Sequence, residues 1–158
     1  MSKKICEITI ENSVDYEGKL NNHKDYVRLL DIIEKKCDFI GITSEHKIIE
    51  KFQKDIICSE KTQEWWGIWR SYEEEIFFIK SSKEMFECLK KYETFCKTVE
   101  KKVKIGDIEF SNYVAELTEF GFNDIAFYDK SKKILLRTNT HEGFIDITKE
   151  IDKEFIAK

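Results

Sequence analysis

The apolar residues of this chain change their spacing along the sequence, and this change constrains the fold more than any other feature. Two segments place apolar residues at the spacing of an amphipathic helix. Their stripes consist of Tyr26, Leu29, Leu30, Ile33 and Cys37, and of Met85, Cys88, Leu89, Tyr92 and Cys96. The other segments are short runs rich in β-branched and aromatic residues between polar turns, which favour strands. The mixture predicts an α+β fold.

The helical signals predict five helices. The first covers residues 22–36, and a second follows a cap at Ser44. A third begins at a capping box formed by Ser81 and Glu84, and a fourth, short helix follows Ser111 and is closed by Gly121. A terminal helix follows Thr148. The apolar positions of the second helix are Ile48, Ile49, Phe52 and Ile56. Those of the fourth helix are Tyr113, Val114, Leu117 and Phe120, and those of the terminal helix are Ile151 and Phe155.

The strand signals are arranged mainly as hairpins. We expect an opening strand over 5–10, a polar loop over 12–18 and a buried strand over 39–42. A hairpin is expected over 64–79, and a type II′ hairpin around Gly106 and Asp107. The last three strands, over 124–128, 134–138 and 144–147, are expected to form a meander. In the 64–79 hairpin the polar residues 70–75 are the predicted link. Because hairpins outnumber βαβ units, the sequence predicts an antiparallel or mixed β-sheet with helices packed mainly on one face. Residues 1–158 form a single domain in this interpretation.

Charge and hydropathy exclude several classes of function. The formal net charge is -4, so the chain lacks the basic field by which proteins bind nucleic acid backbones. No run of about 18 uncharged residues is present, so we expect no membrane association, and the early charges argue against a signal peptide. We therefore expect a cytoplasmic protein. The Lys-rich, Ile-rich and Pro-free composition indicates an AT-rich bacterial genome.

Residues suited to metal binding or catalysis are scattered. The five cysteines form no CxxC pair, and the three histidines, His23, His46 and His141, lie in different segments. We therefore expect no disulfide, metal or cofactor, and the six glycines are too dispersed to form a phosphate-binding loop. No catalytic residue is assigned. The most site-like polar cluster is His141 with Glu142, because a loop can project an imidazole and a carboxylate into a cleft.

The least ordinary segment runs from Glu64 to Glu75 and contains all three tryptophans. If the segment is a central strand, its indoles are simply core. If one indole stays exposed beside the acidic residues, the segment is a surface that binds a partner. The partner-binding candidates are Trp66, Trp69, Tyr72, Glu73, Glu74 and Glu75.

These features favour a small acidic protein-binding module over an enzyme. Within that class, an immunity or antitoxin protein that neutralises a basic toxin suits the negative charge. One alternative is a small-molecule-binding protein, or an enzyme of unrecognised type, with an aromatic pocket between sheet and helices. Another is a structural subunit held by a large hydrophobic interface. The sequence does not indicate the oligomeric state.

Overall fold

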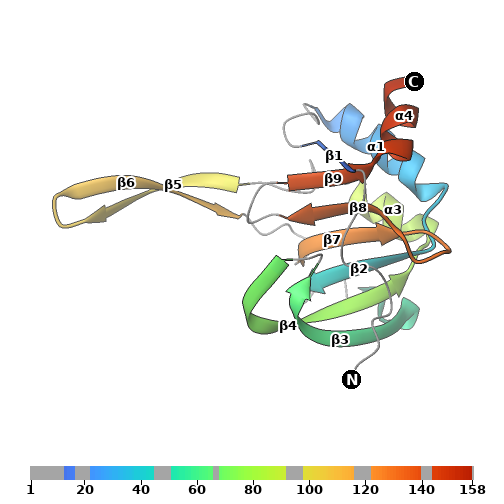
Figure 1. The fold of residues 1–158 in the computed structure, drawn as a ribbon, viewed down its shortest axis with the longest axis horizontal. Helices are drawn as coiled ribbons and strands as arrows, with labels where there is room; N and C mark the ends of the chain where they lie inside the picture. Colours follow the sequence, from blue (N-terminus) through green and yellow to red (C-terminus); the bar gives the residue numbers. More distant parts are fainter. Residues whose placement is uncertain are drawn as a thin grey trace.

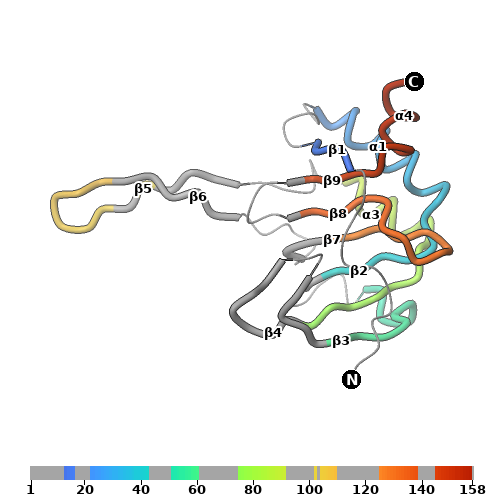
Figure 2. The backbone as a smooth tube through the Cα atoms, in the orientation of Figure 1, coloured from blue at the N-terminus to red at the C-terminus, as the bar shows by residue number. Residues whose placement is uncertain are grey.

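The computed structural model describes the backbone of residues 13–16, 22–44, 51–65, 68–91, 98–115, 122–139 and 144–157 (Figure 1), and Figure 2 colours those whose side chains are also described. The predicted opening strand over 5–10 lies outside them. Their strands are β1 (Ser13–Asp15), β2 (Phe39–Ser44), β3 (Ile56–Trp65), β4 (Ile68–Lys80), β5 (Thr98–Ile105), β6 (Ile108–Ala115), β7 (Phe122–Tyr128), β8 (Ile134–Asn139) and β9 (Phe144–Thr148). Their helices are α1 (His23–Glu34), α3 (Lys83–Leu89), α4 (Lys149–Ala157) and the short 3-10 helix η1 (Gln53–Asp55).

Seven of these strands form one sheet in the order β1-β9-β8-β7-β2-β4-β3 (Figure 1). Every pair in it is antiparallel. The strands β7, β8 and β9 form the meander expected over 124–128, 134–138 and 144–147, and β2 matches the predicted buried strand. The remaining strands, β5 and β6, pair with each other as a separate two-stranded sheet. The predicted α+β fold with an antiparallel sheet is confirmed.

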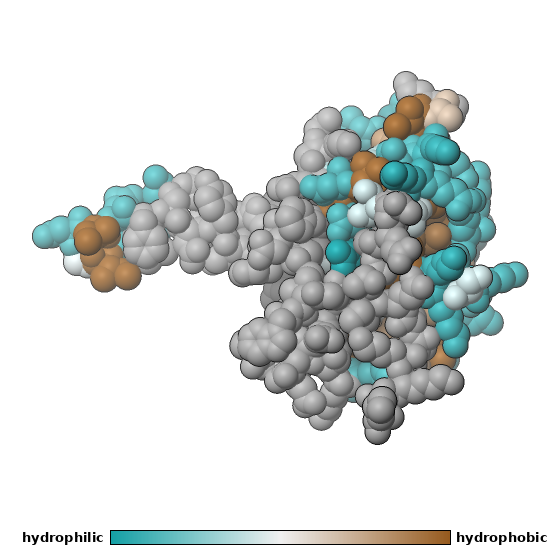
Figure 3. Space-filling view, in the orientation of Figure 1, coloured by the Kyte–Doolittle hydropathy of each residue, from teal (hydrophilic) through white to brown (hydrophobic). Residues whose placement is uncertain are grey.

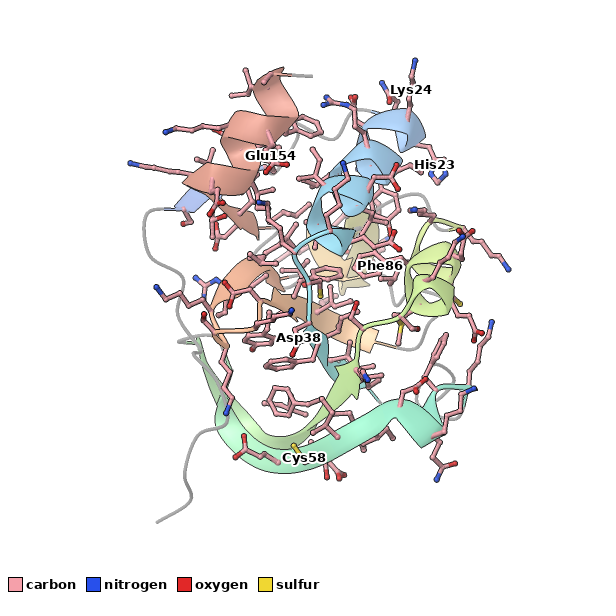
Figure 4. The ribbon with its side chains drawn as sticks, turned by 90° about the vertical axis from the view of Figure 1, so that its right-hand side faces the viewer. His23, Lys24, Asp38, Cys58, Phe86 and Glu154 are labelled. Atoms are coloured by element: carbon pink, nitrogen blue, oxygen red, sulfur yellow. The ribbon has the colours of Figure 1, made fainter. Side chains whose placement is uncertain are left out.

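One face of the sheet packs against the helices. The buried core there joins Leu29, Leu30 and Ile33 of α1 to sheet residues such as Ile40 and Phe127. Phe86 of α3 lies between its helix and the sheet, with its ring centroid 5.7 Å from that of Phe127 (Figure 4). The helices therefore pack mainly on one face, as predicted.

Side-chain caps set the helix starts. Asn22 accepts a hydrogen bond from the Asp25 N–H at 2.9 Å, and Thr148 accepts one from the Ile151 N–H at 3.3 Å. The third helix begins one residue later than predicted, because Ser82 rather than Ser81 accepts from the Met85 N–H, at 3.1 Å. The first and terminal helices thus agree with the sequence.

The opposite face of the sheet carries a second, aromatic core. Its rings are Phe39, Phe78 and Tyr128, and the Phe39 and Tyr128 rings stack with centroids 4.8 Å apart. Along β2, Phe39 belongs to this cluster and Ile40 to the helix-facing core, as strand alternation requires. The central strands are therefore buried on both faces.

Two predicted helices differ from the structure where it describes them. Of the helix predicted after the cap at Ser44, Lys51 is helical, but the last predicted apolar position, Ile56, opens β3. Ser111, Tyr113 and Val114 lie within β6. The helical spacing after Ser111 is overridden because β6 pairs with β5 along its whole length. Residues 45–50 and 116–121 lie outside the described part.

Two loop predictions are also corrected. The polar stretch 70–75 is not the link of the hairpin but part of β4, and its Glu75 pairs with Lys61 of β3. Opposite charges at paired positions stabilise a strand that looks like a turn from its polarity alone. Within the predicted loop 12–18, residues 13–15 form β1, which pairs with β9.

Candidate functional site

The β5–β6 arm, defined as Thr98–Ala115, projects away from the seven-stranded sheet as a long ribbon (Figure 1). Its turn is Gly106-Asp107, as predicted, and Gly106 has a φ of 61°. Among the described residues other than glycine only Lys132 has a positive φ. A positive φ at the first turn position alone is the pattern of a type II′ turn, which matches the twist of the flanking strands.

The arm tip, residues 105–108, is exposed and carries two isoleucines on either side of Gly106 and the charged Asp107. Ile105 and Ile108 occupy paired positions on either side of the turn, and they are 64% and 69% exposed. Figure 3 shows the brown hydrophobic side chains of the tip at the far end of the arm, beside hydrophilic ones. Lys104 and Glu109 form the next pair inward, and both are exposed. Two large aliphatic side chains side by side in water are typical of a surface that binds another molecule.

The sequence indicated the hairpin but not its position in space. Alternation about Gly106 and Asp107 predicts two strands, and it cannot show that they leave the body of the domain. Ile57 and Ile156 are also strongly exposed, at 57% and 67%, but they lie on β3 and α4 of the body. The arm tip is the place in the described structure where two exposed isoleucines form a cross-strand pair.

The tryptophan segment is only partly described. Trp66 lies outside the described residues, whereas Trp69, Tyr72, Glu73 and Glu74 are placed on β4 by their backbone. Of these candidates, Glu75 has a described side chain, which is exposed. The exposure of an indole and the acidic rim stay predictions. β3 ends at Trp65 and β4 begins at Ile68, so Trp65 and Trp69 lie on different strands of one hairpin.

The polar candidates are not brought together within the described part. His141 and Glu142 lie outside it, as does His46. His23 is exposed at the start of α1, and its ring centroid is 5.8 Å from that of Tyr26 (Figure 4). The described residues contain no cluster of His, Cys, Asp and Glu able to hold a metal ion.

Three cysteines are described, and all three are free thiols. Burial raises the pKa of the Cys37 thiol to about 12. Cys58, at the β3 edge of the sheet in Figure 4, also has a raised pKa, because of burial and then the charge of Glu60. A nucleophilic cysteine needs a lowered pKa, so neither Cys37 nor Cys58 suits that role. Cys6 and Cys96 lie outside the described residues.

A surface pocket of about 450 Å³ lies beside α3. It is lined by Lys51, Lys83, Glu84, Glu87, Cys88 and Lys91. The Lys51 ammonium donates to the Cys88 sulfur at 3.5 Å. The residues that line this pocket include no aromatic side chain, so it is not the aromatic pocket expected between sheet and helices.

Comparison with known proteins gives no match to any family model, curated protein or solved structure. Within the described part of the chain, each helix is too short or too polar to span a lipid bilayer. The fold and the arm are therefore the observations on which a function is proposed.

Proposed function

We propose that this chain is a protein-binding module and that its β5–β6 arm contacts the partner. The observation that carries the proposal is the exposed pair Ile105 and Ile108 at the end of a projecting ribbon. An isoleucine side chain moved from water into an interface contributes roughly 1.5–3 kcal/mol when it is fully buried. The tip thus offers a compact apolar anchor, and the exposed charges of Lys104 and Glu109 form a polar rim around it.

The charge of the chain bears on the kind of partner. The formal net charge is -4, so a basic protein is attracted at long range and associates faster at low ionic strength. A more specific version of the proposal is that the chain is an immunity or antitoxin protein that acts in the cytoplasm on a basic toxin. It rests on charge and composition alone.

The test compares the wild-type chain with a tip variant and a body variant. Partners are captured from the source organism, identified, purified and titrated against the double substitution Ile105→Ser with Ile108→Ser. We expect that variant to lose about 2–3 kcal/mol of binding free energy, which is roughly a 30- to 150-fold weaker affinity. The matched control is Ile156→Ser, which removes an equally exposed isoleucine from α4 and should leave the affinity unchanged. Equal binding by the tip variant and the control contradicts the proposal.

The second candidate function is binding of a small anion in the α3 pocket. The observation that favours it is the convergence of Lys51, Lys83 and Lys91 on one cavity, where these lysines outnumber the two glutamates of the lining. Thermal unfolding in the presence of phosphate, citrate and nucleotides tests it. A rise in the melting temperature that is lost in Lys51→Gln, and kept in Lys130→Gln on the far turn, supports this candidate over the arm.

A further inference from the structure

The two edges of the β5–β6 arm differ in charge. The β5 edge carries four charged residues among its eight, namely Glu100, Lys101, Lys102 and Lys104. The β6 edge carries one, Glu109, and the stretch from Phe110 to Ala115 carries none. Natural proteins protect exposed strand edges from pairing with other chains by placing charges there, especially lysines. The β5 edge has this protection, and the β6 edge lacks it.

The arm is also incomplete as a sheet. Its strands pair only with each other among the described strands, and a two-stranded ribbon alone is marginally stable in water. Three register pairs that share the face of Ile105 and Ile108 are apolar: Ile105–Ile108, Val103–Phe110 and Val99–Val114. Pairing with further strands stabilises such a ribbon, because it adds backbone hydrogen bonds and extends the apolar face.

We propose that the β6 edge pairs antiparallel with the β6 edge of a second copy of this chain, so that two arms form one four-stranded sheet. The inference rests on the proposed function, since it concerns the same arm, but it names a second copy in place of a basic protein as the chain that the arm contacts. In the register with Asn112 opposite Asn112 of the other copy, Phe110 lies opposite Val114 and Ser111 opposite Tyr113. Glu109 then lies opposite Ala115, so no like charges meet.

The backbone pattern supports this register. A two-residue turn closes on a pair that exchanges both backbone hydrogen bonds, so Ile105–Ile108 and every second pair after it bond within the arm. The N–H and C=O groups of Glu109, Ser111, Tyr113 and Ala115 are then directed toward the free edge. In the proposed register each of these four residues lies opposite another of the four in the second copy, so their outward N–H and C=O groups can form hydrogen bonds with each other.

The same chemistry disfavours pairing through β5. Two-fold antiparallel pairing of β5 about its centre places Lys101 opposite Lys101 or Lys102 opposite Lys102 of the other copy. The same registers also place Glu100 opposite a lysine, but each β5 edge carries three lysines and one glutamate, so the two edges meet with an excess of positive charge. Like charges directly opposite each other destabilise a sheet. Pairing through β6 also brings Ile108, the first residue of β6, beside the base of the other arm, whereas Ile105 on β5 lies one strand further from the seam. A second copy therefore accounts for the uncharged edge.

The first experiment measures the oligomeric state of the intact chain by sedimentation equilibrium between about 1 and 100 µM, where dissociation of a homodimer depends on concentration. We expect the wild type to be a dimer. Ser111→Pro removes an edge N–H, and Ser111→Lys adds an edge charge; each should raise the dissociation constant at least about tenfold. The matched control is Lys102→Pro, because Lys102 is the register partner of Ser111 on the other edge. It should leave the dimer intact, and circular dichroism checks that all variants stay folded.

A second experiment reports the register. Asn112→Cys places two thiols on the two-fold axis, at a pair that is not hydrogen-bonded, where the spacing suits a disulfide. We expect it to form a covalent dimer under mild oxidation. Lys101→Cys, the register partner of Asn112 on β5, should not do so in the same background of native cysteines.

The outcomes separate this inference from the proposed function. A wild type that stays monomeric at 100 µM (roughly the upper end of the range above), or a dimer that Lys102→Pro and Ser111→Pro weaken equally, overturns pairing through β6. If a monomeric chain still captures another protein through Ile105 and Ile108, the proposed function stands and the arm binds a different chain. If neither association depends on the arm, both proposals fail.

Discussion

Asp15 of β1 and Asp146 of β9 occupy directly paired positions in the sheet, so two carboxylates share one face. Like charges at such positions destabilise an antiparallel pair. Arg137 of β8 pairs with Asp146 from the other side, and its Nε donates to Oδ2 of Asp146 at 3.1 Å. The side chains of Arg137 and Asp146 are only 19% and 15% exposed. The guanidinium therefore compensates a charge repulsion that the fold itself creates.

Removal of that guanidinium is expected to be costly. Arg137→Gln should lower the free energy of unfolding by about 2 kcal/mol or more, because it leaves the Asp146 carboxylate unpaired beside Asp15. Urea unfolding measures the change. Asp15→Asn added to the Arg137→Gln variant should recover part of the lost stability, because it removes the second carboxylate. The amide oxygen of the new asparagine can still accept a hydrogen bond from the Ile145 N–H. Lys36→Gln, which removes the surface pairs with Glu150 and Glu154, serves as the control and should cost at most about 1 kcal/mol.

The elements that the sequence predicts correctly are those whose signals are local. The stripe of Tyr26, Leu29, Leu30 and Ile33 belongs to α1, and all four residues are buried. Thr148 accepts the first-turn hydrogen bond of α4. Ile125 and Phe127 are two positions apart, and both are buried in the core on the same face of β7. This spacing identifies the strand, because every second residue of a strand lies on the same face of the sheet. Spacing and caps are sufficient in these cases.

The elements that the sequence misses depend on partners distant in the chain. Tyr113 and Val114 fit a helical spacing, but their strand is fixed by pairing with β5. Glu75 reads as part of a turn, and its strand is fixed by pairing with β3. The sequence does not mark the arm tip as a site, because Ile105 and Ile108 resemble ordinary core residues of a hairpin. Only the arrangement in space shows that they are exposed.

The Tyr26 hydroxyl ties α1 to the end of α3, and its loss should destabilise the fold. It donates to the Leu89 carbonyl at 2.7 Å in a buried environment. Tyr26→Phe keeps the ring and leaves the carbonyl without this donor, so we expect a loss of about 1–3 kcal/mol in the free energy of unfolding. Chemical denaturation with fluorescence detection measures it. An unchanged midpoint would mean that water replaces the hydroxyl at no cost.

The arm tip should matter for association and not for folding. Ile105→Thr and Ile108→Thr remove little buried area, so each should change the stability of the body by less than about 0.5 kcal/mol. Phe78→Ala, in the aromatic core of the sheet, should cost about 3–5 kcal/mol by comparison. Calorimetry on the three variants checks the contrast. A large loss of stability from either tip variant would show that the tip packs against the body in solution.

The buried thiol of Cys37 gives the fold a defined sensitivity to alkali. Its pKa is raised from the usual value of 9.0 to about 12 because burial disfavours the thiolate. In the unfolded chain the thiol ionises near its ordinary pKa, whereas in the folded chain it stays protonated. The contribution to stability is therefore fully present below about pH 9 and is lost as the pH rises toward 12.

We predict that the free energy of unfolding falls above pH 9 and that Cys37→Ala reduces the steepness of the fall. One group that is protonated only in the folded state contributes a slope of about 1.4 kcal/mol per pH unit. Urea titrations of both proteins at pH 8, 9, 10 and 10.5 (roughly spanning the ordinary thiol pKa) measure the difference in slope. Tyr16, whose pKa is also raised by burial and then by its hydrogen bond to Asp152, adds to the fall in both proteins and cancels in the comparison. Parallel curves for wild type and Cys37→Ala would show that the Cys37 thiol ionises equally in the folded and unfolded chains.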